Sequence, residues 1–263
     1  MSAIPSKRMP ALFLGHGSPM NAIEQNDFTH FLQNLPSTLP APKEILMISA
    51  HWMTRGTFAT HMSQPKTIHD FYGFPQALFD VQYPAPGSPN LAEQLTQTIS
   101  HPSIGHDDHE WGLDHGAWSV LTHIYPDANV PVVQLSLDMT QPGGFYLKLG
   151  KQLRTLREQG VLIIGSGNIV HNLRQTDRNL NATPLGWAQE FDEWVKEKMI
   201  ERNFDALSRD FLSAPSGRLA NPTLDHYLPL LYVLGTADEK DEISFIYEGI
   251  QNASISMRCV RVG

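Results

Sequence analysis

The sequence lacks the features that mark secreted, membrane-bound or disulfide-stabilised proteins. It has a single cysteine, Cys259, which excludes an intrachain disulfide and a zinc site made of several thiolates from this chain. Its apolar runs are far shorter than the roughly 18 residues of a membrane span, and the one near residue 11 is too short for a secretory signal. We therefore expect a cytoplasmic location and no membrane partner.

Positive charge is also scarce. The chain has 19 lysines and arginines against 27 acidic residues, and its formal net charge is -8. A chain with this balance has no general attraction for polyphosphate or for anionic lipid. We therefore expect no nucleic-acid partner, whereas oligomeric state cannot be inferred from these counts.

The length and hydrophobic content are those of an ordinary folded domain. The chain has 263 residues, of which 41% are hydrophobic, and it shows no internal repeat or low-complexity tract. A chain of this size can bury a sizeable core, and α/β folds of this length are commonly single domains. We expect one domain over residues 1–263.

Short apolar runs rich in β-branched residues predict the central strands. They lie at 11–15, 44–50, 130–137 and 161–167. Runs that are apolar at every position suit strands buried on both faces of a parallel sheet. Near the end of the chain, 243–250 and 254–262 alternate instead, which predicts an antiparallel pair at the edge of the sheet.

Helical patterns separate the predicted strands. Ser88 and Pro89 provide an N-cap and a first-turn proline for the segment that follows, and a second apolar periodicity over 143–160 stops at Gly160. Alternation of strand and helix predicts an α/β fold, with a mostly parallel central sheet, helices on both faces and antiparallel edge strands near the C-terminus.

Histidines follow three of the predicted strands. His16 and His51 come at or just after the ends of the first two runs, and His171 comes shortly after the fourth; His226 precedes a predicted helix. Loops at the carboxyl ends of parallel strands converge on one edge of the sheet, where ligands bind. A single histidine there is usually a hydrogen-bonded loop residue, but the joint pattern, with small neighbours, indicates a metal site.

Two other features bear on chemistry. His115 lies in WGLDHGAW beside an acidic residue and between two tryptophans, which suits either a general acid/base or a buried histidine at a helix start. The aromatic segment 69–89 is too apolar for a disordered linker, and Phe71, Tyr72 and Phe74 within it could either wall a substrate or simply pack under the loop.

Seven short motifs occur in order: GHGSPM, SAHW, HDFYGFP, YPAPG, GLDHGAW, GSGNIVHN and DHYLPL. Together they resemble the LigB-type class III extradiol ring-cleavage dioxygenases, in particular the DOPA dioxygenase branch. The resemblance covers residues 11 to about 235. By itself, GHGS also resembles the metal-handling loop of cobalamin-pathway chelatases.

The resemblance implies a non-haem Fe(II) site that opens a catechol ring beside its hydroxyl groups with O2. On the matching positions, His16, His51 and His226 hold the metal. His171 is a further ligand or a proton-transfer residue, and His115 serves proton transfer or substrate placement. The implied small-molecule partners are O2 and a catechol, with 3,4-dihydroxyphenylalanine (DOPA) opened between carbons 4 and 5 as the expected substrate.

The third metal position departs from the usual pattern of non-haem iron oxygenases, which have two histidines and one carboxylate. Here it offers His226 next to Asp225, and we favour the histidine because adjacent residues on a helix point in different directions. A set of three neutral imidazoles also suits zinc, so Zn(II) is expected to occupy the same site in purified protein.

Three other functions remain open at this point. A zinc hydrolase would need a carboxylate base beside the metal, for which the motifs offer Asp114 and Asp225. A tetrapyrrole chelatase would need no O2. A non-enzymatic metal-binding protein would explain the histidines but not the aromatic DFYGFP segment.

Overall fold

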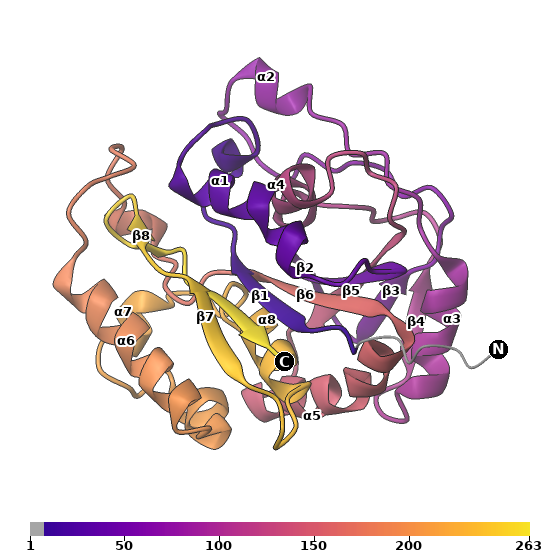
Figure 1. The fold of residues 1–263 in the computed structure, drawn as a ribbon. Helices are drawn as coiled ribbons and strands as arrows, with labels where there is room; N and C mark the ends of the chain where they lie inside the picture. Colours follow the sequence, from indigo (N-terminus) through magenta and orange to yellow (C-terminus); the bar gives the residue numbers. More distant parts are fainter. Residues whose placement is uncertain (1–7) are drawn as a thin grey trace.

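Four parallel strands form the middle of an eight-stranded sheet in the computed structural model, which describes residues 8–263 (Figure 1). The strand order is β4-β3-β5-β2-β6-β1-β10-β7, and a separate small sheet pairs β8 with β9. The strands are β1 (Ala11–Gly15), β2 (Glu44–Thr54), β3 (Thr57–Thr60), β4 (Ile104–Asp107), β5 (Val132–Asp138), β6 (Val161–Gly167), β7 (Ile243–Tyr247), β8 (Ile250–Gln251), β9 (Ile255–Ser256) and β10 (Cys259–Val262).

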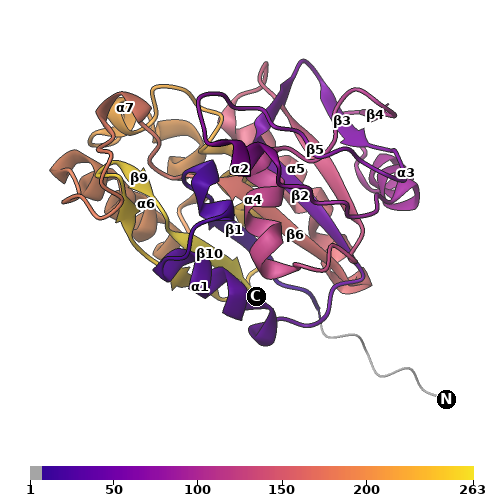
Figure 2. The same cartoon turned by 90° about the horizontal axis from the view of Figure 1, so that it is seen from above.

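Helices cover both faces of this sheet, as the fold class predicted. The helices are α1 (Asp27–Asn34), α2 (Gln76–Phe79), α3 (Pro89–Thr98), α4 (His115–Ile124), α5 (Gly143–Leu153), α6 (Gly186–Ile200), α7 (Gly217–Ala220) and α8 (Leu228–Gly235). Figures 1 and 2 show α1, α2 and α4 on one face and α5 and α8 on the other. Within residues 8–263, no helix combines the length and the apolar character needed to cross a membrane.

The apolar runs are uninterrupted because both faces of each central strand are buried. Along β1, Ala11 and Phe13 belong to the core on the α5 and α8 side, whereas Leu12 and Leu14 belong to the core on the α1 and α4 side. Side chains alternate between the faces of a strand, so a strand with helices on both sides must be apolar at every position.

The predicted antiparallel strands are confirmed: β10 pairs with β1 on one side and with β7 on the other, and β7 forms the edge. At the opposite edge the structure adds β3 and β4, which the sequence did not predict because TFAT and IGHD contain no extended apolar run. The helix predicted to reach Gly160 ends at Leu153. A 3-10 helix, η3 (Arg154–Gln159), continues from there to Gly160, which has the left-handed φ of 93°.

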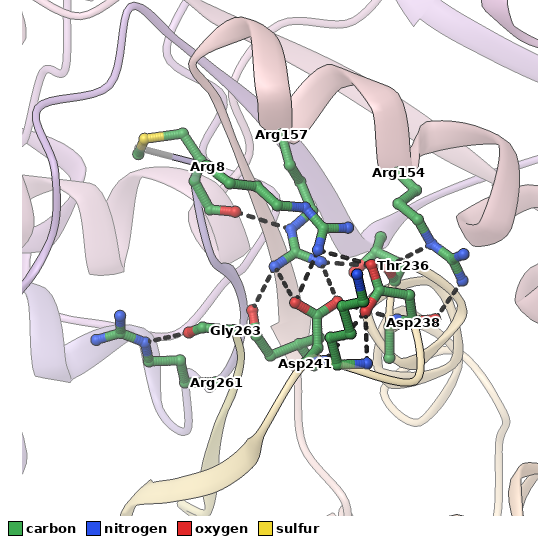
Figure 3. A network of polar contacts seen from close by, with 12 residues as sticks. Arg8, Arg154, Arg157, Thr236, Asp238, Asp241, Arg261 and Gly263 are labelled. Atoms are coloured by element: carbon green, nitrogen blue, oxygen red, sulfur yellow. Dashed lines mark hydrogen bonds and ion pairs between the residues drawn. The ribbon is translucent and has the colours of Figure 1, made fainter. Parts of the chain in front are cut away.

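A buried ion pair joins the two ends of the described chain (Figure 3). Arg157 of η3 makes two hydrogen bonds to the Asp241 carboxylate, of 2.7 and 3.1 Å. The same guanidinium donates to the carbonyl oxygens of Met9 and Val262, at the outer ends of β1 and β10. Since Arg157 is 1% exposed, these contacts replace the hydration that it loses on burial.

We predict that Asp241→Ala lowers the free energy of unfolding by about 3 kcal/mol, since it leaves Arg157 buried without its counter-charge. Denaturant titration measures the change. The control is Glu201→Gln, which removes the exposed pair between Lys198 and Glu201 and should cost less than about 1 kcal/mol. Equal effects of the two substitutions would contradict this account.

Candidate metal centre

Three adjacent strands deliver histidines to one edge of the sheet. β6 lies between β1 and β2 and is parallel to both. His16 follows β1 directly and His171 follows β6 after a short turn. His51 lies inside β2 rather than after it, so the strand is longer than the sequence predicted. It falls within an irregularity in the pairing of β2 with β5, between Ile48 and Met53.

Two helix starts bring further imidazoles to the same place. His226 lies two residues before α8, and its ring centroid is 5.2 Å from that of His16 and 4.9 Å from that of His51. His115 begins α4, with its ring 3.8 Å from that of His51. The His171 ring stacks on the His226 ring at 3.4 Å. All five histidines singled out in the sequence therefore meet.

These rings line a cavity of about 590 Å³. The remaining lining residues are Gly17, Ser18, Pro19, Asp70, Phe71, Tyr72, Phe74, Leu173, Thr176, Asp177, Arg178, Asn252 and Ile255. A larger groove of about 990 Å³ runs along α5 and α8 but contains none of the five histidines. We therefore place the chemistry in the smaller cavity.

Neighbouring groups fix the tautomer of His16. The Ser166 hydroxyl donates its single hydrogen to the Gly116 carbonyl at 2.6 Å, so it can only accept from His16 Nδ1, which is 2.8 Å away. The proton of His16 therefore sits on Nδ1, and the Nε2 lone pair is free to bind a cation.

Carboxylates fix the tautomers of two more histidines. Asp225 contacts Nδ1 of His226, and Asp70 contacts Nδ1 of His115 at 2.9 Å. Burial raises the pKa of both carboxyls, but the hydrogen bonds from the two histidines outweigh it, so both pKa values are lowered and both groups are ionised. Such outer carboxylates orient metal-binding histidines in many proteins.

The geometry and charge state fit a divalent metal. The Nε2 atoms of His16 and His51 are 3.3 Å apart. Two nitrogen ligands at about 2.1 Å from one ion lie about 3.0–3.4 Å apart at octahedral or tetrahedral angles. One ligand nitrogen each from His16, His51 and His115 lies within 4.8 Å of the others. The chain therefore has a three-histidine cluster suited to a non-haem metal.

Burial keeps the imidazoles of His16, His51 and His171 neutral, which is the form that binds metal. Desolvation lowers the pKa of His16 well below its ordinary range, and so does His226 beside it. Desolvation likewise lowers the pKa of His51, with His115 as its strongest neighbour. Desolvation and His226 lower the pKa of His171 to about 2. Because these lowered pKa values leave nitrogen lone pairs unprotonated near neutral pH, the cluster can bind a metal ion.

Glycines allow the elements that carry the histidines to meet. A Cβ on Gly116, the second residue of α4, would lie 2.4 Å from Ser49 Oγ and 2.9 Å from His51 Cδ2. A Cβ on Gly167, at the end of β6, would lie 2.1 Å from the His226 carbonyl oxygen. Larger residues at either position would push α4 or the start of α8 away from the sheet edge.

The three aromatic residues singled out in the sequence all line the cavity. Phe71 packs against the His115 ring at 5.6 Å and against Phe74 at 5.3 Å. Phe71 also contacts Trp118, so its packing role and its place in the wall coexist. Tyr72 is 92% exposed, which places it at the rim.

Sequence reasoning missed Asp70, Ser166, Asp177 and Arg178. Asp70 follows His69 in the HDFYGFP motif, where an acid beside an aromatic run was the available signal. Asp177 and Arg178 lie on a polar loop with no pattern of their own. Asp114, considered earlier as a base, is fully buried and bonded to Ser49 and Gln134, and burial and the charge of Asp70 raise its pKa.

Comparison with known proteins identifies the class. A family model described as the catalytic LigB subunit of aromatic ring-opening dioxygenase matches residues 10–258. The chain is 48% identical over 263 residues to the 4,5-DOPA dioxygenase extradiol of Escherichia coli K12, covering 98% of this chain and 96% of that one. It is 35% identical over 240 residues to the Beta vulgaris protein of the same name, covering 89% of each.

A solved structure has the same fold. The crystal structure of an uncharacterized protein from Escherichia coli K12 matches with a TM-score of 0.85 at 43% identity, covering 97% of this chain and 100% of that one. Fold, site and relatives together define a metal-dependent extradiol dioxygenase, an oxidoreductase that acts on an aromatic substrate with O2. The chain belongs to the LigB family.

The lowered pKa of His171 predicts a pH dependence of stability in metal-free protein. An unfolded histidine titrates near pH 6.5, so below that pH the unfolded chain binds a proton that folded His171, with its pKa of about 2, does not. The free energy of unfolding therefore falls as the pH falls. Between about pH 7.5 and about pH 5.0 this histidine contributes a loss of about 2 kcal/mol.

Denaturant titration of metal-free wild type and His171→Gln at these two pH values tests the assignment. The variant is expected to lose about 2 kcal/mol less than the wild type on acidification. An equal loss in the two proteins would show that His171 accepts a proton in the folded state.

Proposed function

We propose that this chain, acting as one catalytic domain over residues 1–263, opens the ring of a catechol that bears an amino-acid side chain. The proposed substrate is DOPA, cleaved between carbons 4 and 5, with both atoms of O2 retained in the product. The convergence of five imidazoles on an aromatic-walled cavity carries the proposal. The relatives named 4,5-DOPA dioxygenase extradiol support the substrate.

We propose Fe(II) as the active metal and His16, His51 and His226 as its ligands, with Zn(II) able to occupy the same nitrogens. Two observations favour His226. Its ring lies about as far from those of His16 and His51 as theirs lie from each other, 5.2 Å. Asp225 engages its Nδ1, which leaves Nε2 as the nitrogen for a metal. His171, stacked on His226, is either a fourth ligand or a proton-transfer residue beside it.

The chain's own residues then have distinct tasks. A divalent metal, when bound, lowers the pKa of a coordinated catechol hydroxyl. His115 keeps its proton on Nδ1 through Asp70, so its Nε2 can take the second catechol proton and return it later. Phe71 and Phe74 hold the ring and exclude water on one side. Asp70 positions His115 through two contacts, to Nδ1 and to the backbone N–H.

A zinc hydrolase fits the site less well. Its carboxylate base would have to be free to contact a water molecule. Asp225 is engaged by His226 and Asp70 by His115, while Asp114 is fully buried beneath the cavity. Asp225 and Asp70 therefore orient histidines, and Asp114 is bonded to Ser49 and Gln134 instead.

The function is tested by loading metal-free protein with Fe(II) under anaerobic conditions and adding DOPA, then air. We expect oxygen uptake equal to the catechol lost, and a new yellow product. The control is the same protein loaded with Zn(II), which has no redox chemistry and should consume no oxygen. A panel of catechols that all fail to consume oxygen with the Fe(II) protein would refute the proposed activity.

Two alanine variants separate the ligand from the proton-transfer residue. His226→Ala should lose most of its metal, whereas His115→Ala should keep near-normal metal content and turn over at least about 100-fold more slowly. Metal analysis and turnover of the Fe(II)-loaded proteins give both quantities. The control is His30→Ala, at an exposed histidine outside the cavity.

The reverse result, metal loss in His115→Ala and retention in His226→Ala, would transfer the ligand role to the set of His16, His51 and His115, whose ligand nitrogens lie within 4.8 Å of one another.

A further inference from the structure

Two adjacent side chains of opposite charge lie at the mouth of the cavity. Asp177 and Arg178 belong to the loop between the 3-10 helix η4 (Leu173–Gln175) and α6, and both line the cavity. Both residues are exposed, whereas the histidines His16, His115 and His226 are buried. The cavity therefore has a metal-binding floor and a charged, solvent-facing rim.

Backbone hydrogen bonds hold this rim in place. The Asp177 N–H donates to the Asn252 carbonyl at 2.9 Å, and the Asn252 side-chain amide donates back to the Asp177 carbonyl at 2.9 Å. The Asn252 N–H also donates to the Leu180 carbonyl at 2.9 Å. Asn252 lines the cavity as well, so the loop is fixed to the cavity wall at the point where its charges lie.

The Arg178 guanidinium is available to a ligand. Within residues 8–263, it makes no hydrogen bond or ion pair, unlike the buried Arg157 and Arg258, which are fully paired. It is the one arginine or lysine among the residues that line the cavity. Asp177 accepts one hydrogen bond, from the Asn179 N–H to its Oδ1 at 2.7 Å, and its Oδ2 has no partner among the residues that the structure describes. Asp70, the other carboxylate of the lining, is bonded to His115.

We propose that Arg178 binds the carboxylate and Asp177 the ammonium group of the substrate's side chain, an inference that rests on the proposed function. The catechol hydroxyls must face the histidines at the floor, so the substituent on the far side of the ring extends toward the rim. A guanidinium matches a carboxylate with two parallel hydrogen bonds. A site of this kind rejects analogues that lack the charged group, because its own charges are then left unpaired.

Four catechols separate the two contacts: DOPA; 3,4-dihydroxyphenylpropionate, which lacks the amine; dopamine, which lacks the carboxylate; and 4-methylcatechol, which lacks both. Oxygen uptake gives kcat and KM for each with the Fe(II)-loaded protein. For Arg178→Gln we expect kcat/KM on the two carboxylates to fall about tenfold relative to 4-methylcatechol, mainly through KM. Arg178→Lys should recover part of the loss, since lysine keeps the charge but not the paired geometry.

Asp177→Asn tests the second contact. It should lower kcat/KM on DOPA and dopamine, which carry an ammonium group, relative to the other two substrates. The matched control is Arg174→Gln, an exposed arginine on the adjacent η4 that does not line the cavity. It changes the net charge by the same amount as Arg178→Gln and should leave the ratios among the four substrates unchanged.

The outcomes distinguish this inference from the function on which it rests. A wild-type protein that consumes oxygen with none of the four catechols refutes the proposed function. A wild-type protein that is active, with substrate ratios that Arg178→Gln and Asp177→Asn do not alter, refutes the rim contacts and leaves the ring-opening activity standing. Equal changes in Arg174→Gln and Arg178→Gln would reduce the effect to general surface charge and would also refute the inference.

Discussion

The site depends on imidazoles that are held neutral and turned in a fixed direction inside the protein. A buried histidine that is free to choose its tautomer would bind a proton or a backbone group as readily as a metal ion. Ser166, Asp225 and Asp70 remove that choice, because each engages the Nδ1 atom of a different histidine. Burial removes protonation as a competitor by lowering the pKa of His16 and His51. Nε2 is then the nitrogen left for a ligand on His16, His226 and His115, and all three histidines line the cavity.

The parallel sheet brings these histidines together with short connections. Because β1, β6 and β2 are parallel neighbours, histidines at or near their carboxyl ends reach the same edge without a long connecting loop. The ends of the strands are also where side chains must pack closely, and Gly116 and Gly167 provide the room. A substitution at either glycine would therefore disturb the site by moving whole elements, although neither residue can contact substrate through a side chain.

The sequence predicted the features that repeat locally and missed those that depend on distant contacts. Four apolar runs predicted the parallel strands, and the histidines that follow three of these runs predicted where imidazoles gather. Both predictions depend only on residues that are adjacent in the chain. The short β3 and β4 carry no such pattern. Ser166 is a small residue inside an apolar strand, and its importance rests on its two neighbours, His16 and the Gly116 carbonyl, which are far away in the chain. Arg178 likewise could not be singled out from the sequence, because only the folded structure places it beside the cavity.

Substitutions at the floor of the cavity and at its rim are expected to have different effects. His16, His115 and His226 are buried, and each is bonded at Nδ1 to a neighbouring side chain, so a substitution there also removes an internal hydrogen bond. Asp177 and Arg178 are exposed, and their loop is attached to the wall through backbone groups and the Asn252 amide. Their side chains can change without loss of those attachments. The buried edge of the sheet thus holds the histidine cluster, whereas the proposed contacts to the substrate's side chain lie on exposed residues.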